Sequence, residues 1–426
     1  MRLSGRQLRS RHDRGPDRRT GWAAVVIEAH RPALEAAAAA PMLAQVRQWS
    51  LVNSGSRNLD GLAVMAGLLA DAFAALPGEV ALRDAVPGEA VDAAGNVQPL
   101  DYGRNLHVRV RPGAPVQLLL TGHMDTVYAP DHPFQTLTDM DGGAVLNGPG
   151  VADMKGGIAL MLAALAALEA SPLGSRIGYE VVINSDEEIA SPGSAALIAE
   201  AARGKLAALT YEPSSLPDGT LAGARPGSGN FSIIVTGRSA HAGRNPEEGR
   251  NAIVAAADLA LRLSRARRSG LAINPARIDG GGPNNVVPDR AILRVNLRPA
   301  LPEDQAIAQA LIDDLAKAVA AEHDVAIHVH GGFGRPPKPI DDKAARLFAL
   351  VEESAALLGR PITHKASGGV CDGNNIAACG VPVVDTMGAR GGAIHSPDEY
   401  LIVESLPERA QLSTLVMLRL AERGSL

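Results

Sequence analysis

Hydrophobic positions in the first half of the chain follow two alternating kinds of spacing. Apolar residues recur at helical intervals over 31–54 and 58–76. The run "APVQLLLTGHMD" (114–125) has instead the unbroken aliphatic composition of a strand that is buried on both faces. Helix and strand then alternate through "KGGIALMLAALAALEAS" (helix), "RIGYEVVINSD" (strand), "SPGSAALIAEAARG" (helix) and "KLAALTYEP" (strand). This rhythm predicts an α/β fold with a mostly parallel sheet.

The pattern changes at about residue 224. Strand-like "GSGNFSIIVTGRSA", a helix with a basic end, two strand-like segments, the helix "EDQAIAQALIDDLAKAVAAEHD" and the strand "VAIHVHGGF" follow in that order. Such a β-α-β-β-α-β series is typical of a ferredoxin-like α+β unit. The proline-rich "GRPPKPID" indicates an exit linker, after which helix and buried strand return. We therefore expect a small domain, 224–334, inserted between the two parts of a larger domain, 23–223 and 335–426.

Composition narrows the function classes. The 426 residues are 46% hydrophobic and 20% charged, which predicts a globular protein with a large core. A formal net charge of −5 and 3% aromatic residues argue against binding to nucleic acid or to an anionic membrane surface. No apolar window approaches the 18 uncharged residues of a transmembrane helix, so no membrane contact is expected.

The N-terminal residues and the cysteines indicate the cellular compartment. Residues 1–22 are strongly basic without the apolar segment of a signal peptide, which predicts a disordered leader. The two cysteines, Cys371 and Cys379, suit a reducing compartment better than a disulfide framework, and we expect ordinary buried thiols. A cytoplasmic location follows as an expectation.

Chemistry-bearing residues gather where the predicted strands end. His123 and Asp125 follow the buried strand in "TGHMDTV" and point the same way, so Asp125 is placed to orient the His123 imidazole toward a metal. A turn with an exposed histidine is the alternative. Asp153, in glycine-rich "NGPGVADMKGG", precedes a helix and is a metal ligand or, alternatively, an N-cap.

Two further strand ends carry glutamates. Glu187 and Glu188 lie in "NSDEEIAS", and Glu212 lies in "TYEPS". Crowded carboxylates repel one another and are costly to bury without a cation, so a solvated loop is the alternative for each motif alone. Carboxyl ends of parallel strands meet at one edge of a sheet, however, and the coincidence favours a single site. Asp186, the first acid of the run, receives no role.

The motifs "TGHMDTV", "GPGVADMKGG", "NSDEEIASPGS", "YEPS", "GRSAHAG" and "GGAIHSPDEY" resemble, in order and spacing, those of the dinuclear zinc aminoacylase/carboxypeptidase family. That family includes glutamate carboxypeptidases, acetylornithine deacetylases and succinyl-diaminopimelate desuccinylases. The resemblance covers about 115–420 and implies a zinc-peptidase-like catalytic domain with an inserted lid or dimerisation domain.

The resemblance also implies a ligand set for two zinc ions. His123 and Glu212 bind one ion, Glu188 and His395 bind the other, and Asp153 bridges them with a commonly cis peptide bond after it. Cobalt and manganese also accept such mixed imidazole and carboxylate ligands.

Further roles are implied outside the ligands. Glu187 is the general base and acid. His241 stabilises the oxyanion and, in dimeric members, reaches the partner's active site, so a homodimer through the small domain is expected. Asn285 and Arg298 contact substrate, and Arg298 grips a carboxylate. Gly369 belongs to a glycine-rich turn near the substrate backbone, ahead of Asp372, which is alternatively a helix cap.

The expected activity is hydrolysis of an amide bond in a small, dipeptide-like molecule that bears a free carboxylate, of the glutamate carboxypeptidase type. Deacylation of an N-acyl amino acid is the close alternative, because bond and metals are the same. A non-catalytic member that binds a ligand between the domains is a third reading, which the intact Glu187 and ligand set disfavour.

Overall fold

The computed structural model describes residues 18–426 of the chain. Helix α1 (Arg18–Ala39) begins inside the predicted leader, so the prediction of disorder is wrong for residues 18–22, and residues 1–17 lie outside the described part. The later turns of α1 bury Leu34 and Ala37 against helices α4 and α10. Once a helix is anchored by packing, each added residue gains one hydrogen bond without a new nucleation cost. This accounts for a helix that begins before residue 23.

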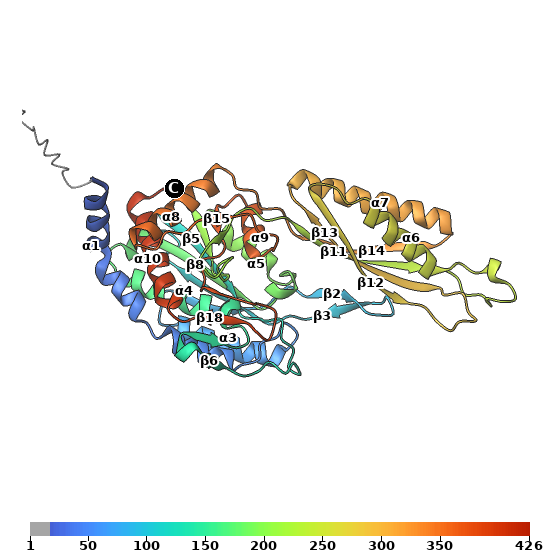
Figure 1. Ribbon diagram of the computed structural model, residues 1–426, viewed down its shortest axis with the longest axis horizontal. Helices are drawn as coiled ribbons and strands as arrows, with labels where there is room; N and C mark the ends of the chain where they lie inside the picture. Colours follow the sequence, from blue (N-terminus) through green and yellow to red (C-terminus); the bar gives the residue numbers. More distant parts are fainter. Residues whose placement is uncertain (1–17) are drawn as a thin grey trace, which may run out of the picture.

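The larger domain is built on a six-stranded sheet (Figure 1). Four neighbouring strands pair in parallel, whereas the two pairings at one edge, β1 with β4 and β4 with β8, are antiparallel. In spatial order the strands are β1 (Glu79–Arg83), β4 (Asn105–Val110), β8 (Ile177–Asn184), β5 (Val116–His123), β9 (Ala207–Thr210) and β16 (Val383–Val384). The predicted α/β class with a mostly parallel, mixed sheet is confirmed, whereas β1 was not foreseen.

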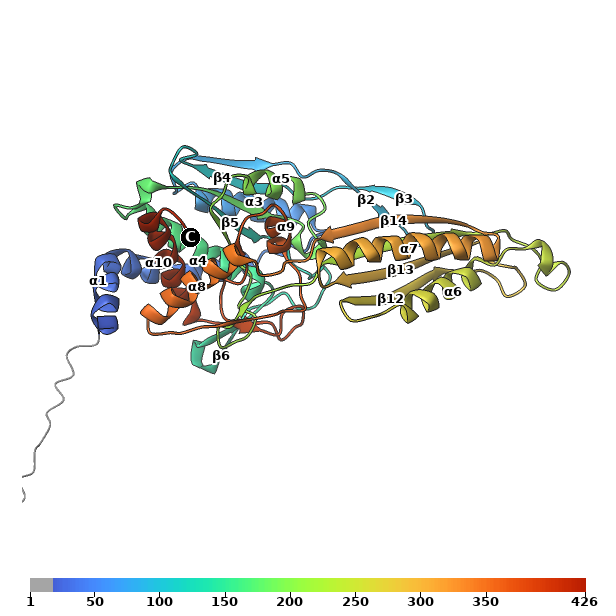
Figure 2. The ribbon, with the colours of Figure 1, turned by 90° about the horizontal axis from the view of Figure 1, so that it is seen from above.

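Helices cover both faces of this sheet, as Figure 2 shows from above. On β5, Leu118 and Leu120 pack in the main core, whereas Leu119 belongs to a second cluster on the opposite face. The strand is thus buried on both faces, as its aliphatic run predicts. The main core takes residues from α2 (Met42–Ser50), α3 (Leu59–Phe73), α4 (Gly156–Glu169), α8 (Asp342–Leu357) and α10 (Ser405–Arg423), and the second cluster from α5 (Ala195–Ala202) and α9 (Asp372–Ala378).

Among the described residues, one helical stretch, Val151–Glu169, is long and apolar enough to pass a membrane-span test. Its window is 94% buried inside the fold, between the sheet and neighbouring helices. Burial on all sides accounts for its apolar composition, as for a core helix.

The inserted unit projects from the larger domain in Figure 1 and has one antiparallel sheet in the order β12-β13-β11-β14. Its elements are β11 (Ser228–Thr236), α6 (Ala252–Arg265), β12 (Leu271–Gly280), β13 (Arg290–Pro299), α7 (Pro302–His323) and β14 (Ala326–Arg335). Both helices pack on one face of the sheet around a separate apolar core. We call the unit the small domain.

Several short elements escaped the hydrophobic pattern, because they carry little periodicity. A hairpin of β2 (Gly88–Val91) and β3 (Val97–Leu100) reaches the small domain, where Arg290 donates to Gly95 O (2.9 Å) and Arg294 to Val91 O (2.9 Å). The remaining strands are β6 (Thr138–Met140), β7 (Val145–Asn147), β10 (Leu221–Ala222), β15 (His364–Lys365), β17 (Gly391–Gly392) and β18 (Tyr400–Ile402). Short helical turns are η1 (Asp141–Gly143), η2 (Val151–Lys155), η3 (Gly174–Arg176), η4 (Glu187–Ile189) and η5 (Pro246–Glu248).

The cysteine prediction holds for one residue only. Cys371 is buried, but Cys379, at the end of α9, is exposed, and both thiols are free. Nothing in the site described below involves Cys379.

Candidate metal centre

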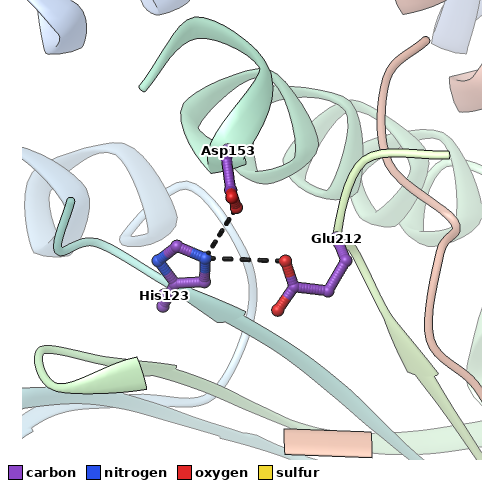
Figure 3. Close-up of side chains that lie close together, drawn as sticks. All are labelled: His123, Asp153 and Glu212. Carbon is purple, nitrogen blue, oxygen red and sulfur yellow. Dashed lines mark hydrogen bonds and ion pairs between the residues drawn. The ribbon is translucent and has the colours of Figure 1, made fainter. Parts of the chain in front are cut away.

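The carboxyl edge of the large sheet brings together residues from distant parts of the sequence. His123 is the last residue of β5, and Glu212 follows the end of β9. Asp153 lies in η2, just before α4, with a cis peptide bond to Met154. Figure 3 shows the three side chains pointing toward one another from these separate elements.

The three side chains form one group of potential metal ligands. His123 Nε2 lies 3.0 Å from Asp153 Oδ1 and 3.6 Å from Glu212 Oε2. One donor atom from each residue lies within 4.8 Å of the other two, and all three residues are buried. Oε1 of Glu212 is buried without a hydrogen-bond partner among the described residues, so it is available to a cation.

A second group shares Asp153 with the first. His395 Nε2 lies 3.1 Å from Glu188 Oε2 and 3.4 Å from Asp153 Oδ2. Asp153 therefore directs one oxygen to each histidine, the arrangement required of a bridging carboxylate. The His395 side chain remains 52% exposed, which places this group nearer to solvent than the first.

The electrostatics of these residues fit cations. Burial and the neighbouring charge of Asp153 raise the pKa of Glu188 to about 7, and burial raises the pKa of Glu212. Hydrogen bonds to Asp153 and Glu188 raise the pKa of His395 to about 11. Carboxylates that resist ionisation and an imidazole that attracts a proton indicate a site short of positive charge. Two divalent cations would supply +4 against the −3 of the three carboxylates.

Asp125 connects both halves of the centre. Its backbone oxygen lies 3.0 Å, and its Oδ1 3.4 Å, from His123 Nδ1, which leaves Nε2 of the ring facing Asp153. Its carboxylate also accepts hydrogen bonds from the backbone N–H groups of Glu187 (3.1 Å) and Glu188 (3.2 Å). The orienting contact expected from the sequence is thus present, and the same residue fixes the loop that carries the glutamates.

A buried carboxylate that the sequence analysis missed supports Asp153. Glu399 accepts hydrogen bonds from the backbone N–H groups of Gly150 (3.1 Å), Ala152 (3.0 Å) and Asp153 (3.1 Å), and from Tyr128 Oη (2.9 Å). Only its place in "HSPDEY", four residues after His395 in a motif already quoted, could have drawn attention to it. Glu399 therefore holds the irregular turn that presents Asp153 to both ligand groups.

The acids of "NSDEEIAS" have distinct environments. Asp186 is fully buried and accepts hydrogen bonds from Ser194 Oγ (2.6 Å) and Gly193 N (2.6 Å), so it shapes the loop. Burial raises the pKa of Glu187 well above its ordinary value, and the charge of Arg335 opposes this effect. Glu187 and Glu188 both line the cavity described next. The solvated-loop alternative does not apply to these residues.

A cavity of about 260 Å³ opens beside the ligand groups. Its walls contain acidic residues of the centre, one guanidinium, hydroxyl groups and a glycine turn: Asp153, Glu187, Glu188, Glu212, Ser214, Ser215, Arg225, Ser367, Gly369, Thr386 and His395, among others. Gly369 thus lies where a substrate-contacting turn was expected. The alternative for Asp372 was a helix cap. Asp372 is instead the first residue of α9, and Cys371 is the N-cap.

Three residues expected at the substrate are not among those lining this cavity. Arg298 Nη1 donates to Gly368 O at 2.7 Å, so this guanidinium binds the backbone of the glycine turn. His241 and Asn285 are exposed and lie together, since Ala242 N donates to Asn285 O (2.9 Å). The loop of His241, 237–251, is at the distal end of the small domain in Figure 2, and the segment of Asn285, between β12 and β13, pairs with it. Within one chain they are far from the ligand groups.

Arg225 is the guanidinium that lines the cavity, and sequence analysis gave no reason to select it from the linker "GARPG". Its Nε and Nη2 donate to Asp385 Oδ2 (2.8 Å) and Oδ1 (3.0 Å), and Lys338 Nζ adds a contact to Asp385 at 3.0 Å. A Cβ placed on Gly369 would lie 3.5 Å from Nη1 of Arg225, so this nitrogen faces the glycine turn. The Asp385 pair holds the guanidinium at the cavity wall.

Proteins with similar sequences include a carboxypeptidase and a desuccinylase. Carboxypeptidase G2 of Pseudomonas sp. is 31% identical over 330 residues, covering 75% of this chain and 78% of that protein. A succinyl-diaminopimelate desuccinylase of Xanthomonas oryzae pv. oryzae is 30% identical over 325 residues, covering 71% and 83%. The chain is a hydrolytic enzyme of the carboxypeptidase or deacylase type.

The fold also resembles that of a peptidase of known structure. A Bacillus subtilis structure described as a dinuclear metal binding peptidase from the M20 family superposes with a TM-score of 0.63 at 18% identity, covering 89% of this chain and 98% of that one. Residues 119–419 match the model of "Peptidase family M20/M25/M40". The resemblance in the motifs is therefore confirmed, and the chain belongs to the peptidase family M20/M25/M40.

Proposed function

We propose that the enzyme hydrolyses the amide or peptide bond of a small substrate with a free carboxylate, as a carboxypeptidase that depends on two zinc ions. The observation that carries this proposal is the pair of ligand groups that share Asp153 beside a cavity lined by Glu187. Bound zinc would lower the pKa of a water molecule toward ~7 and polarise the scissile carbonyl.

The residues of the chain supply the rest of the chemistry. Glu187 accepts a proton from the attacking water and later delivers it to the leaving amine, so the proton balance of hydrolysis closes. Asp125 keeps His123 oriented and holds the backbone of Glu187. Ligand and base are thereby fixed relative to each other before substrate binds.

The function is tested by screening the zinc-loaded protein against matched N-acyl amino acids and dipeptides, with a metal-free preparation as control. Cleavage of C-terminal amino acids supports the carboxypeptidase reading. Release of small acyl groups alone would support the deacylase alternative, which the similarity to the desuccinylase favours. If the protein bound compounds of this panel without zinc and cleaved none of them, the enzymatic mechanism would be contradicted.

Arg225 is assigned to the substrate carboxylate in this proposal. We expect Arg225→Gln to lower kcat/KM about tenfold or more for an acid substrate and to affect its neutral amide analogue little, because a guanidinium–carboxylate contact contributes ~1.5–3 kcal/mol. Arg298→Ala is the matched control at a guanidinium outside the cavity lining. If the preference for the acid substrate over the amide fell more in Arg298→Ala than in Arg225→Gln, Arg298 would be the residue that binds the substrate carboxylate.

His241 and Asn285 are assigned to the active site of a second copy, with a homodimer formed through the small domain. Their exposure and distal loop suit an action outside their own chain. Mixing His241→Ala with Glu187→Gln protein should restore about a quarter of activity under random subunit exchange, since half of the dimers carry one intact composite site. Activity of a monomeric preparation equal to that of the dimer would exclude this arrangement.

A further inference from the structure

Arg335 connects the small domain to the catalytic base. It is the last residue of β14, and its side chain is only 1% exposed. Its Nη2 donates to Glu187 Oε1 at 2.7 Å and to the backbone oxygen of Glu187 at 3.2 Å. We propose that Arg335 is a positioning residue that holds the Glu187 carboxylate in place for proton transfer; this inference rests on the proposed function.

The geometry of this contact restricts Glu187 more than a simple ion pair does. One guanidinium nitrogen binds the carboxylate and the main chain of the same residue, so both ends of the Glu187 side chain are tied. Asp125 holds the neighbouring N–H of Glu187 from the other side. A long, flexible glutamate side chain otherwise samples several rotamers, and a displacement of about 1 Å costs roughly 10²-fold in rate.

A second carboxylate anchors the guanidinium itself. Arg335 Nη1 binds Asp372 Oδ1 and Asn375 Oδ1, the latter at 2.9 Å. Asp372 in turn accepts hydrogen bonds from Ser191 Oγ (2.6 Å) and Asn184 Nδ2 (2.9 Å). The planar guanidinium is therefore fixed by α9 on one side and presents its other nitrogen to Glu187.

The same contacts distinguish Arg335 from a substrate-binding arginine. It is not among the residues that line the cavity, and both Nη atoms are engaged by protein groups. Nε is buried without a hydrogen-bond partner among residues 18–426. By contrast, Arg225 reaches the cavity wall. Arg335 thus acts through Glu187 rather than on substrate.

Its position in the chain adds a link to the domain arrangement. Arg335 pairs with Ser228 where the two linkers to the small domain run side by side, and Arg225 and Lys338 continue that pairing. Asn374 binds both linkers, donating to Pro226 O (2.9 Å) and Pro336 O (2.7 Å). A shift of the small domain at this junction would move the guanidinium and, with it, the base.

The test uses the full-length, zinc-loaded protein with Arg335→Gln and Arg335→Lys. We expect kcat to fall about 10- to 100-fold with KM nearly unchanged, equally for an acid substrate and its neutral amide analogue, and with two metals retained. Arg335→Lys should recover part of the loss, because an ammonium keeps the charge but not the two-pronged contact. If Arg335→Gln does not fold, the lysine variant carries the measurement.

A double-mutant cycle with Glu187→Asp separates positioning from general damage. In that background, Arg335→Lys should cost clearly less than in the wild type, since the shorter carboxylate no longer reaches the guanidinium. Equal losses in both backgrounds, unchanged kcat, or a rise in KM confined to acid substrates would overturn the proposal. Activity that survives in Glu187→Gln would overturn the proposed function instead, so the two failures are distinguishable.

Discussion

Glu187→Gln should abolish measurable turnover while both metals stay bound. Removal of a general base costs about 10²–10⁴-fold in rate, and Gln keeps the size of the side chain without its capacity to accept a proton. Glu187 belongs to neither ligand group, although it lies beside Glu188 and lines the same cavity. The measurement is steady-state kcat together with metal content by mass spectrometry.

Glu188→Gln is the matched control, because it changes the adjacent carboxylate by the same atoms. That residue belongs to the second ligand group, so its variant should lose metal as well as activity. Near wild-type turnover in Glu187→Gln would remove Glu187 from the role of base. Loss of metal from Glu187→Gln, with metal kept by Glu188→Gln, would exchange the roles of the two glutamates.

Asp153→Ala should release both metal ions, unlike any other single ligand substitution. Its two oxygens face His123 and His395 separately, so each group loses a ligand at once. His395→Ala should retain about one metal per chain, because the buried group of His123 remains intact. Metal stoichiometry and thermal unfolding, with and without added zinc, measure both outcomes.

The stability readout follows from linkage. A metal that binds only the folded state at about 1,000 times its Kd stabilises that state by ~4 kcal/mol per site. Asp153→Ala should therefore lose the zinc-dependent increase in Tm, whereas His395→Ala should keep part of it. Two metals in Asp153→Ala would show that the aspartate does not bridge.

Much of the fold followed from local patterns with strong physical causes. The aliphatic run before His123 predicted a strand that is buried on both faces, and β5 is buried in this way. His123, Glu188 and Glu212 follow the ends of predicted strands, so their meeting could be predicted from the parallel sheet, whereas His395 was expected only from the family resemblance. The two groups of potential ligands that share Asp153 agree with the division that the family resemblance implies.

Other features depend on distances that local sequence does not carry. His241 and Asn285 stand in motifs that resemble substrate contacts, and the loop of His241 lies at the far end of the small domain, away from the larger domain of its own chain. Arg298 was expected to grip a substrate carboxylate, and in the structure its Nη1 donates to the backbone oxygen of Gly368. Residues 18–22 were read as a leader from charge alone, although α1 includes them.

By itself, the sequence predicted the longer strands and helices, the inserted unit and the residues that form two groups of potential metal ligands, because periodicity and motif spacing are local properties. Only the tertiary structure decided which arginines matter and how. Nothing in the local sequence distinguishes the three arginines. Arg225 binds Asp385 at the cavity wall, and Arg298 binds the backbone of Gly368. Arg335 is buried and binds Glu187 and Asp372. A charged side chain takes its role from the partners that the fold brings within hydrogen-bond distance, and those partners lie 70 or more residues away in three of these four contacts.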